Sequence, residues 1–181
     1  GAIVTEPFSQ WVIEDRFAGP RPRWEQVGAE LVGSVASYET AKLRMLNGAH
    51  SALAYLGVKP GTDHVDEAVG RAELRDMAQR LMREEAAPTI ATAPGQDLDR
   101  YAADLLTRFA NTALPHRLRQ IAMDGSQKIP QRWLETLAAQ QASGRSCPMI
   151  LSALAAWLGH IRGDNGPVGG PVAPQLEGPW R

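Results

Sequence analysis

The chain has 181 residues, of which 44% are hydrophobic, and its 19 basic and 20 acidic side chains give a formal net charge of −1. This length and apolar content suit one domain with a substantial core, and the balanced charge offers no extended field for a nucleic acid or an acidic membrane. One cysteine excludes an intramolecular disulfide and no segment is apolar over the roughly 18 residues of a membrane span, so we expect a soluble protein of the reducing cytoplasm.

The first predicted elements are two short β-prone segments, 11–14 and 29–32, which are separated by a proline-rich loop and predict a small two-stranded ribbon. From Ser34 onward the pattern becomes helical. Apolar residues recur every three or four positions, Ser34 or Ser37 can cap the start, and Gly57 is a typical stop. This segment is the longest helix that the sequence predicts.

Shorter helices follow, each with one apolar face. Thr62 can cap a helix that runs through Val69, and the next helix is expected to end before Pro88. Further helices are predicted at 98–109, 116–123, 130–143 and 148–163, followed by a tail rich in glycine and proline. Because such apolar faces must be buried and the β signal is sparse, we predict a mainly α fold with helices packed on helices around one core.

The long helix carries a polar arc in the segment KLRMLNGAHS. At about 100° per residue and with Lys42 at zero, Glu39 falls near 60°, His50 near 80° and Asn47 near 140°. Asn47 and Gly48 are poor residues for a helix interior, so local propensity does not explain them. Two interpretations stay open at this point: a functional cluster, or a turn beside a solvated lysine and an ordinary half-buried histidine.

A resemblance to a known family supports the functional interpretation. Three segments resemble the C-terminal domain of the mannitol dehydrogenase family: TEPFSQWVIEDRF at 5–17, YETAKLRMLNGAHSALAYLG at 38–57 and QIAMDGSQKIPQR at 120–132. This family of zinc-independent, polyol-specific long-chain dehydrogenases includes fructuronate reductase, or mannonate dehydrogenase. The resemblance implies a multi-helix domain of the 6-phosphogluconate-dehydrogenase-like type. It also implies interconversion of mannitol or mannonate with the corresponding ketose or keto-uronate, fructose or fructuronate.

The Lys-x5-Asn-x2-His pattern carries the family's catalytic roles onto this chain. The resemblance implies that Lys42 is the general base, that Asn47 holds the substrate oxygen as charge develops, and that His50 orients the same oxygen. Glu39 stands where the family has a glutamate that is associated with proton passage to solvent. We expect Lys42 to lie in a partly dry cleft, because free lysine, with a pKa of about 10.4, must be lowered to act as a base.

A second polar segment, RFANTALPHRLRQIAMDGSQK, offers substrate-binding side chains. The resemblance favours Lys128 as a residue that contacts substrate. The other candidates for binding a polyhydroxylated chain are His116, Arg117 and Arg119. If the substrate is a hexuronate, the cations available for its carboxylate are Arg117, Arg119 and Lys128. A structural role for Arg108 and Asp124, near the ends of the segment, stays open.

The reaction requires NAD or NADP, but the sequence has no GxGxxG turn of the kind that binds dinucleotides. No metal is required, and we expect none. We therefore expect residues 1–181 to form the helical substrate-binding and catalytic domain, with its own N-terminal Rossmann domain absent from this chain and the isolated chain inactive. The competing hypothesis is a non-catalytic helical interaction domain whose polar arc is merely surface.

Overall fold

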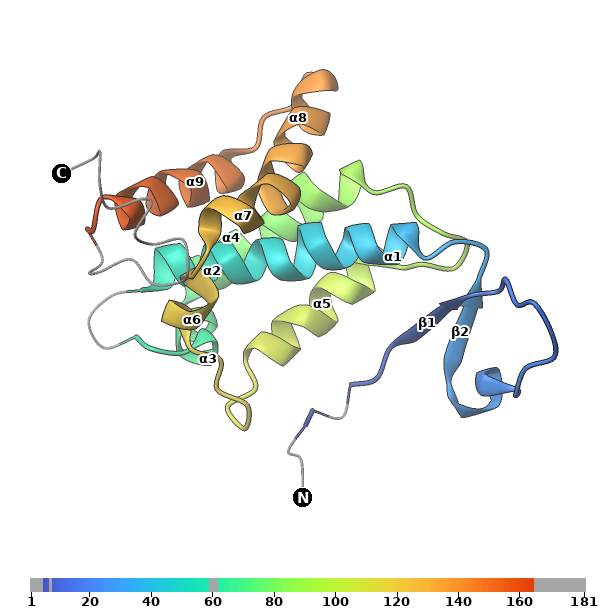
Figure 1. Ribbon diagram of the computed structural model, residues 1–181. Coiled ribbons are helices and arrows are strands. Elements are labelled where there is room, and N and C mark those ends of the chain that lie inside the picture. The colour runs from blue at the N-terminus through green and yellow to red at the C-terminus, as the bar shows by residue number, and fades with distance from the viewer. Residues whose placement is uncertain (1–4, 7, 59–61, 165–181) are drawn as a thin grey trace.

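The computed structural model describes residues 5–6, 8–58 and 62–164. It confirms the mainly α prediction: helices pack around a long central helix, and a small pair of strands projects to one side (Figure 1). Among the described residues no helix is long and apolar enough to cross a bilayer. The predicted tail at 165–181 lies outside the described residues.

The projecting β arm comprises β1 (Trp11–Glu14) and β2 (Ala29–Val32), the two segments that the sequence predicts as strands. The strands pair in parallel, which the sequence did not specify. The connection between them contains the 3-10 turn η1 (Trp24–Val27), where the ring of Trp24 lies 5.8 Å from that of Trp11. A parallel pair cannot be closed by a tight hairpin, so the long proline-rich loop supplies the crossover that this pairing needs.

The central helix runs from Ala36 to Gly57 and changes conformation twice. It consists of α1 (Ala36–Ala41), a π-helical turn η2 (Lys42–Asn47) and α2 (Gly48–Gly57). The helix and its last residue were predicted, but the π turn was not. α2 lies at the centre of the core, because it contacts α3, α4, α6 and α9 and most of its side chains are buried.

The remaining helices surround α2 and form one hydrophobic cluster with it. They are α3 (Val65–Gly70), α4 (Ala72–Arg80), the π turn η3 (Leu81–Ala86), the 3-10 turn η4 (Ala87–Thr89), α5 (Leu98–Phe109), α6 (Leu118–Ala122), α7 (Gly125–Ile129), the π turn η5 (Pro130–Leu134), α8 (Glu135–Ala142) and α9 (Pro148–Ile161). The largest fully buried side chain is Trp133, in η5.

Two predicted helix starts, at Thr62 and at Pro130, were wrong. α3 starts after His64 rather than Thr62, because Glu67 folds back to accept a hydrogen bond from the His64 N–H at 3.1 Å. The predicted start at Pro130 is the middle of a longer helix that begins at Gly125. Proline has no N–H to donate, and the π turn that starts at Pro130 lets the helix continue without that hydrogen bond. The predicted end before Pro88 is confirmed, because η3 ends at Ala86 and Pro88 lies in the separate 3-10 turn η4.

Candidate active site

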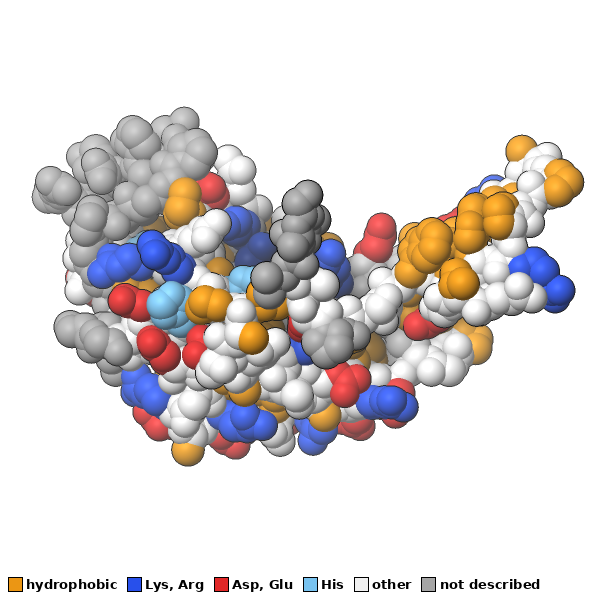
Figure 2. Space-filling view, turned by 90° about the horizontal axis from the view of Figure 1, so that it is seen from below, with side chains coloured by type: hydrophobic (Ala, Val, Ile, Leu, Met, Phe, Trp, Pro, Cys, Tyr) orange, Lys and Arg blue, Asp and Glu red, His pale blue; other side chains and the backbone are white. Residues whose placement is uncertain are grey.

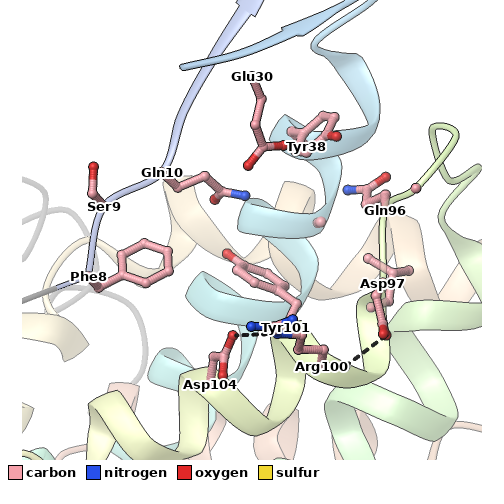
Figure 3. Close-up of a pocket in the computed structure, with 13 residues that line it drawn as sticks. Phe8, Ser9, Gln10, Glu30, Tyr38, Gln96, Asp97, Arg100, Tyr101 and Asp104 are labelled. Carbon is pink, nitrogen blue, oxygen red and sulfur yellow. Dashed lines mark hydrogen bonds and ion pairs between the residues drawn. The ribbon is translucent and has the colours of Figure 1, made fainter. Parts of the chain in front are cut away.

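A groove follows the N-terminal half of the central helix. It consists of an outer pocket of about 500 Å³, a middle pocket of about 370 Å³ and an inner pocket of about 40 Å³. The outer and middle pockets share Tyr38 and Tyr101 as walls, and the middle and inner pockets share Leu46 and Arg108. Figure 3 shows the outer pocket, where Gln10 and Tyr101 point into the space between the chain segment before β1 and helices α1 and α5.

Lys42 and Glu39 both line the middle pocket, as their spacing on the helix predicts. Lys42 is the first residue of the π turn and Asn47 is the last. In a π turn the backbone hydrogen bonds span five residues instead of four, so rotation per residue differs from the α-helical value that the sequence argument used. π turns are rare and occur frequently at functional sites. The Lys42 side chain is exposed, so the partly dry cleft that was expected around it is not found among the described residues.

His50 lies at the inner pocket, in a shielded aromatic setting. Its ring stacks on Phe109 with centroids 4.6 Å apart and meets the edge of His116 at 5.8 Å. Burial is the main cause that lowers the pKa of His50 to about 4, and electrostatic interactions with His116, Arg132 and Arg108 act in the same direction. The imidazole is therefore neutral at pH 7. Among the described residues the buried Nε2 atom of His50 has no hydrogen-bond partner, which a substrate hydroxyl or carbonyl could supply.

An ion pair links the chain segment before β1 to helix α5 at the same pocket. The Arg108 guanidinium donates two hydrogen bonds to Glu6, from Nε to Oε2 at 2.9 Å and from Nη2 to Oε1 at 2.7 Å, and it lies 3.9 Å from the centre of the Phe8 ring. The hydrogen bonds from Arg108 hold the pKa of Glu6 below its usual value. Arg108 thus has a structural role, and Glu6 is a site residue that the sequence analysis missed.

The helix α7–η5 packs against the π turn of the central helix through a close approach at Gly48. A Cβ atom on Gly48 would lie 3.4 Å from the Arg132 carbonyl oxygen, and the Trp133 indole donates to the Gly48 carbonyl at 3.0 Å. Arg132 Nη1 donates to Ser51 Oγ on α2 at 2.7 Å. A Cβ at this position would meet only ordinary van der Waals contacts, so the packing does not require glycine here. The hydrogen bond to Ser51 places Arg132 near His50.

The other predicted site residues divide into two groups. His116 joins His50 in the inner pocket. Lys128 is half-buried on α7, where its Nζ donates to the Met123 carbonyl at 2.6 Å. Arg117 and Arg119 are exposed, and the three pockets, as far as described residues form their walls, include neither of them nor Lys128 or Asn47.

Comparison with known proteins gives consistent matches. The family model described as the mannitol dehydrogenase C-terminal domain matches residues 34–175. D-mannonate oxidoreductase of Escherichia coli (strain K12) is 46% identical over 162 residues, which cover 90% of this chain and 33% of that protein. Mannitol 2-dehydrogenase of Phaeosphaeria nodorum is 38% identical over 166 residues, which cover 90% of this chain and 29% of that protein.

The solved structures agree with the sequence matches. The ternary complex of Pseudomonas fluorescens mannitol 2-dehydrogenase with NAD and D-mannitol superposes with a TM-score of 0.84 at 35% identity, over 96% of this chain and 36% of that chain. A D-sorbitol dehydrogenase in substrate-free form gives 0.84 at 32% identity, over 93% of this chain and 35% of that chain. The chain thus spans about a third of the length of these relatives.

Proposed function

The chain belongs to the mannitol dehydrogenase family, and on this premise we propose that it is the substrate-binding and catalytic domain of an NAD- or NADP-dependent dehydrogenase. The substrate is a sugar alcohol or an aldonate, which is interconverted with the corresponding ketose or keto-uronate. The names of the relatives support this substrate range, because they include both mannitol 2-dehydrogenase and D-mannonate oxidoreductase.

The observation that carries the proposal is the groove that joins Lys42 and Glu39 to a neutral, half-buried His50. In the oxidative direction, the Lys42 amine accepts the proton of the substrate hydroxyl, and Glu39 in the same pocket passes it to solvent. The neutral imidazole of His50 orients the oxygen, and the Asn47 amide donates to it as negative charge develops. A neutral orienting group suits this step, because a second cation beside Lys42 would oppose proton uptake by the amine.

We propose that another part of the whole protein binds the dinucleotide, which accepts the hydride. A dinucleotide is usually bound where a strand leads through a glycine-rich turn into a helix. β2 leads through a short turn into α1, but this turn contains one glycine, Gly33, so the turn does not fit the glycine-rich cradle for a diphosphate.

The β arm supports this domain organisation. Parallel pairs are normally parts of larger, covered sheets, whereas this arm stands alone and exposes Trp11, Phe17 and Val27 (Figure 2). In addition, β2 ends at Val32, just before the match to the family model begins.

The test is Lys42→Ala in the complete dehydrogenase. We expect kcat to fall by about 10² to 10⁴, the usual contribution of a general base, while NAD binding and the free energy of unfolding stay unchanged. Arg75→Ala, which removes an exposed cation from α4, is the matched control and should retain activity. Full turnover by Lys42→Ala would instead favour a non-catalytic helical interaction domain.

A further inference from the structure

The chain segment before β1 forms one wall of all three pockets. Glu6 lines the inner pocket, and Phe8 and Gln10 line both the middle and the outer pocket. Alternate side chains of an extended chain point to the same side, so the spacing of these three residues suits a wall. Figure 3 shows Phe8 and Gln10 on the pocket side of the segment. Among the described residues, the side-chain hydrogen bonds that tie this wall to the helices are the two between Glu6 and Arg108.

Arg108 lies between the two side chains to which proton transfer and substrate orientation are assigned. It is a wall of the middle pocket, which Lys42 lines, and of the inner pocket, which His50 lines. Burial is the main cause of the lowered pKa of His50, and an electrostatic interaction with Arg108 acts in the same direction. A cation at this position also opposes the uptake of a proton by a neighbouring amine, which is the step assigned to Lys42. An uncompensated Arg108 would therefore work against the base.

Glu6 supplies the charge that compensates Arg108. The two side chains are each 23% exposed and form a two-pronged pair, in which both carboxylate oxygens accept hydrogen bonds, at 2.7 and 2.9 Å. The Phe8 ring, 3.9 Å from the guanidinium, packs against it as well. Of the carboxylates among the described walls of the middle and inner pockets, Glu39 is assigned to proton passage, so Glu6 is the one left to neutralise Arg108. The other titratable side chains in these walls are Tyr38, Lys42, His50, Tyr101 and His116.

We propose that Glu6 is a positioning residue of the dehydrogenase, which holds the Arg108 guanidinium in the groove wall and neutralises its charge beside the proton acceptor Lys42. This inference rests on the proposed function, because it takes Lys42 as the base. Glu6 acts through Arg108 and need not touch the substrate. Loss of the Glu6 charge leaves a cation unopposed in the groove, whereas loss of the Arg108 charge leaves an anion unopposed. The two changes therefore act on protonation of the Lys42 amine in opposite directions.

The first measurement is the pH dependence of acylation of Lys42 in the complete protein. Acetic anhydride reacts with an unprotonated amine, so mass spectrometry of the peptide that contains Lys42 gives the pH at which half of this amine is reactive. Glu6→Gln should move this midpoint down by about 0.3–1 pH unit, and Arg108→Gln should move it up by a similar amount. The double variant should return close to the unmodified value. Labelling of Lys128, on α7, is the internal reference and should not move.

Two further variants separate charge from shape. Glu6→Asp keeps the charge but shortens the side chain, so its midpoint should stay closer to that of the unmodified protein than the midpoint of Glu6→Gln does. Glu14→Gln is the matched control, because it removes a carboxylate from β1 that pairs with the exposed Arg16 and lines none of the three pockets as described. This control should leave the midpoint unchanged.

The second measurement is the pH profile of kcat/KM of the complete dehydrogenase with NAD and D-mannitol, an uncharged substrate that a released guanidinium does not attract. The acid limb of this profile should shift in the same directions as the labelling midpoints. If Lys42→Ala is inactive but the Glu6 and Arg108 variants leave the labelling midpoint unmoved or move it in the same direction, the positioning role is overturned while the proposed function stands. If no sugar is oxidised but the midpoints move in opposite directions, the proposed function fails while control of the charge at Lys42 by Glu6 stands. Thermal unfolding of each variant, followed by circular dichroism, controls for misfolding.

Discussion

Acid should destabilise this fold in part through the imidazole of His50. In the folded protein its pKa is about 4, against 6.5 for an ordinary histidine. Above pH 6.5 both the folded and the unfolded chain hold a neutral ring, so His50 contributes no pH dependence. As the pH falls from 6.5 towards 4, the His50 imidazole is protonated in the unfolded chain but stays neutral in the folded chain. The free energy of unfolding therefore decreases by about 1.4 kcal/mol per pH unit. The full loss is about 3 kcal/mol.

The matched variant is His50→Gln, which keeps a polar side chain but cannot titrate. Urea unfolding of both proteins, followed by circular dichroism at pH values from 7.5 to 5, gives the difference between their free energies of unfolding. Between pH 7.5 and pH 5, the unmodified protein should lose about 2 kcal/mol of its free energy of unfolding relative to the His50→Gln variant. His160, whose pKa is also lowered by burial, is present in both proteins and cancels. Parallel pH curves would refute the inference that His50 is buried in its neutral form.

Two further predictions concern packing and the ion pair. Gly125→Ala should lower the free energy of unfolding by about 1–3 kcal/mol, because the new Cβ would lie 2.5 Å from Trp157 Nε1. In the same urea assay, Gly48→Ala should stay within about 1 kcal/mol of the unmodified protein, because its Cβ meets only ordinary contacts. A double-mutant cycle with Glu6→Gln and Arg108→Gln should give a coupling free energy of about 1 kcal/mol at pH 7. Because the folded pKa of Glu6 is lowered, this coupling should persist above the unfolded value of 4.5 and disappear as the pH falls through the folded value. A coupling that is independent of pH would contradict the assigned pair.

Local sequence patterns predicted the helices and strands of this fold better than the pairing of the strands and the way in which one helical segment continues into the next. The strand segments 11–14 and 29–32 and the helix that ends at Gly57 follow from composition and apolar spacing over a few residues. The parallel pairing of the strands depends on a crossover, which apolar alternation does not encode. Pro130 predicted a helix start because proline favours the first turn, yet a π turn lets the helix continue through it.

The candidate site was predictable only where its residues share one helix. The spacing of Glu39 and Lys42 brought both to one face, and the structure puts them in one pocket. The contacts of Glu6 with Arg108 and of Arg132 with Ser51 join residues 102 and 81 positions apart, so no local signal could have paired them. The π turn was missed because the apolar periodicity from which the helix was predicted does not specify the span of its hydrogen bonds.

The π turn also sets the phase between the two halves of the central helix. It accommodates an additional residue within one turn, so removing one position between 42 and 47 would leave the following half nearly in phase. Removing one position from the regular turn that follows, before His50, would instead rotate the rest of the helix by about 100°. Such a rotation would turn His50 away from Phe109 and carry buried α2 side chains toward solvent. A change of one residue in length is therefore best accommodated within the π turn, whereas the regular turns beside it cannot lose a residue without displacing the side chains that α2 buries.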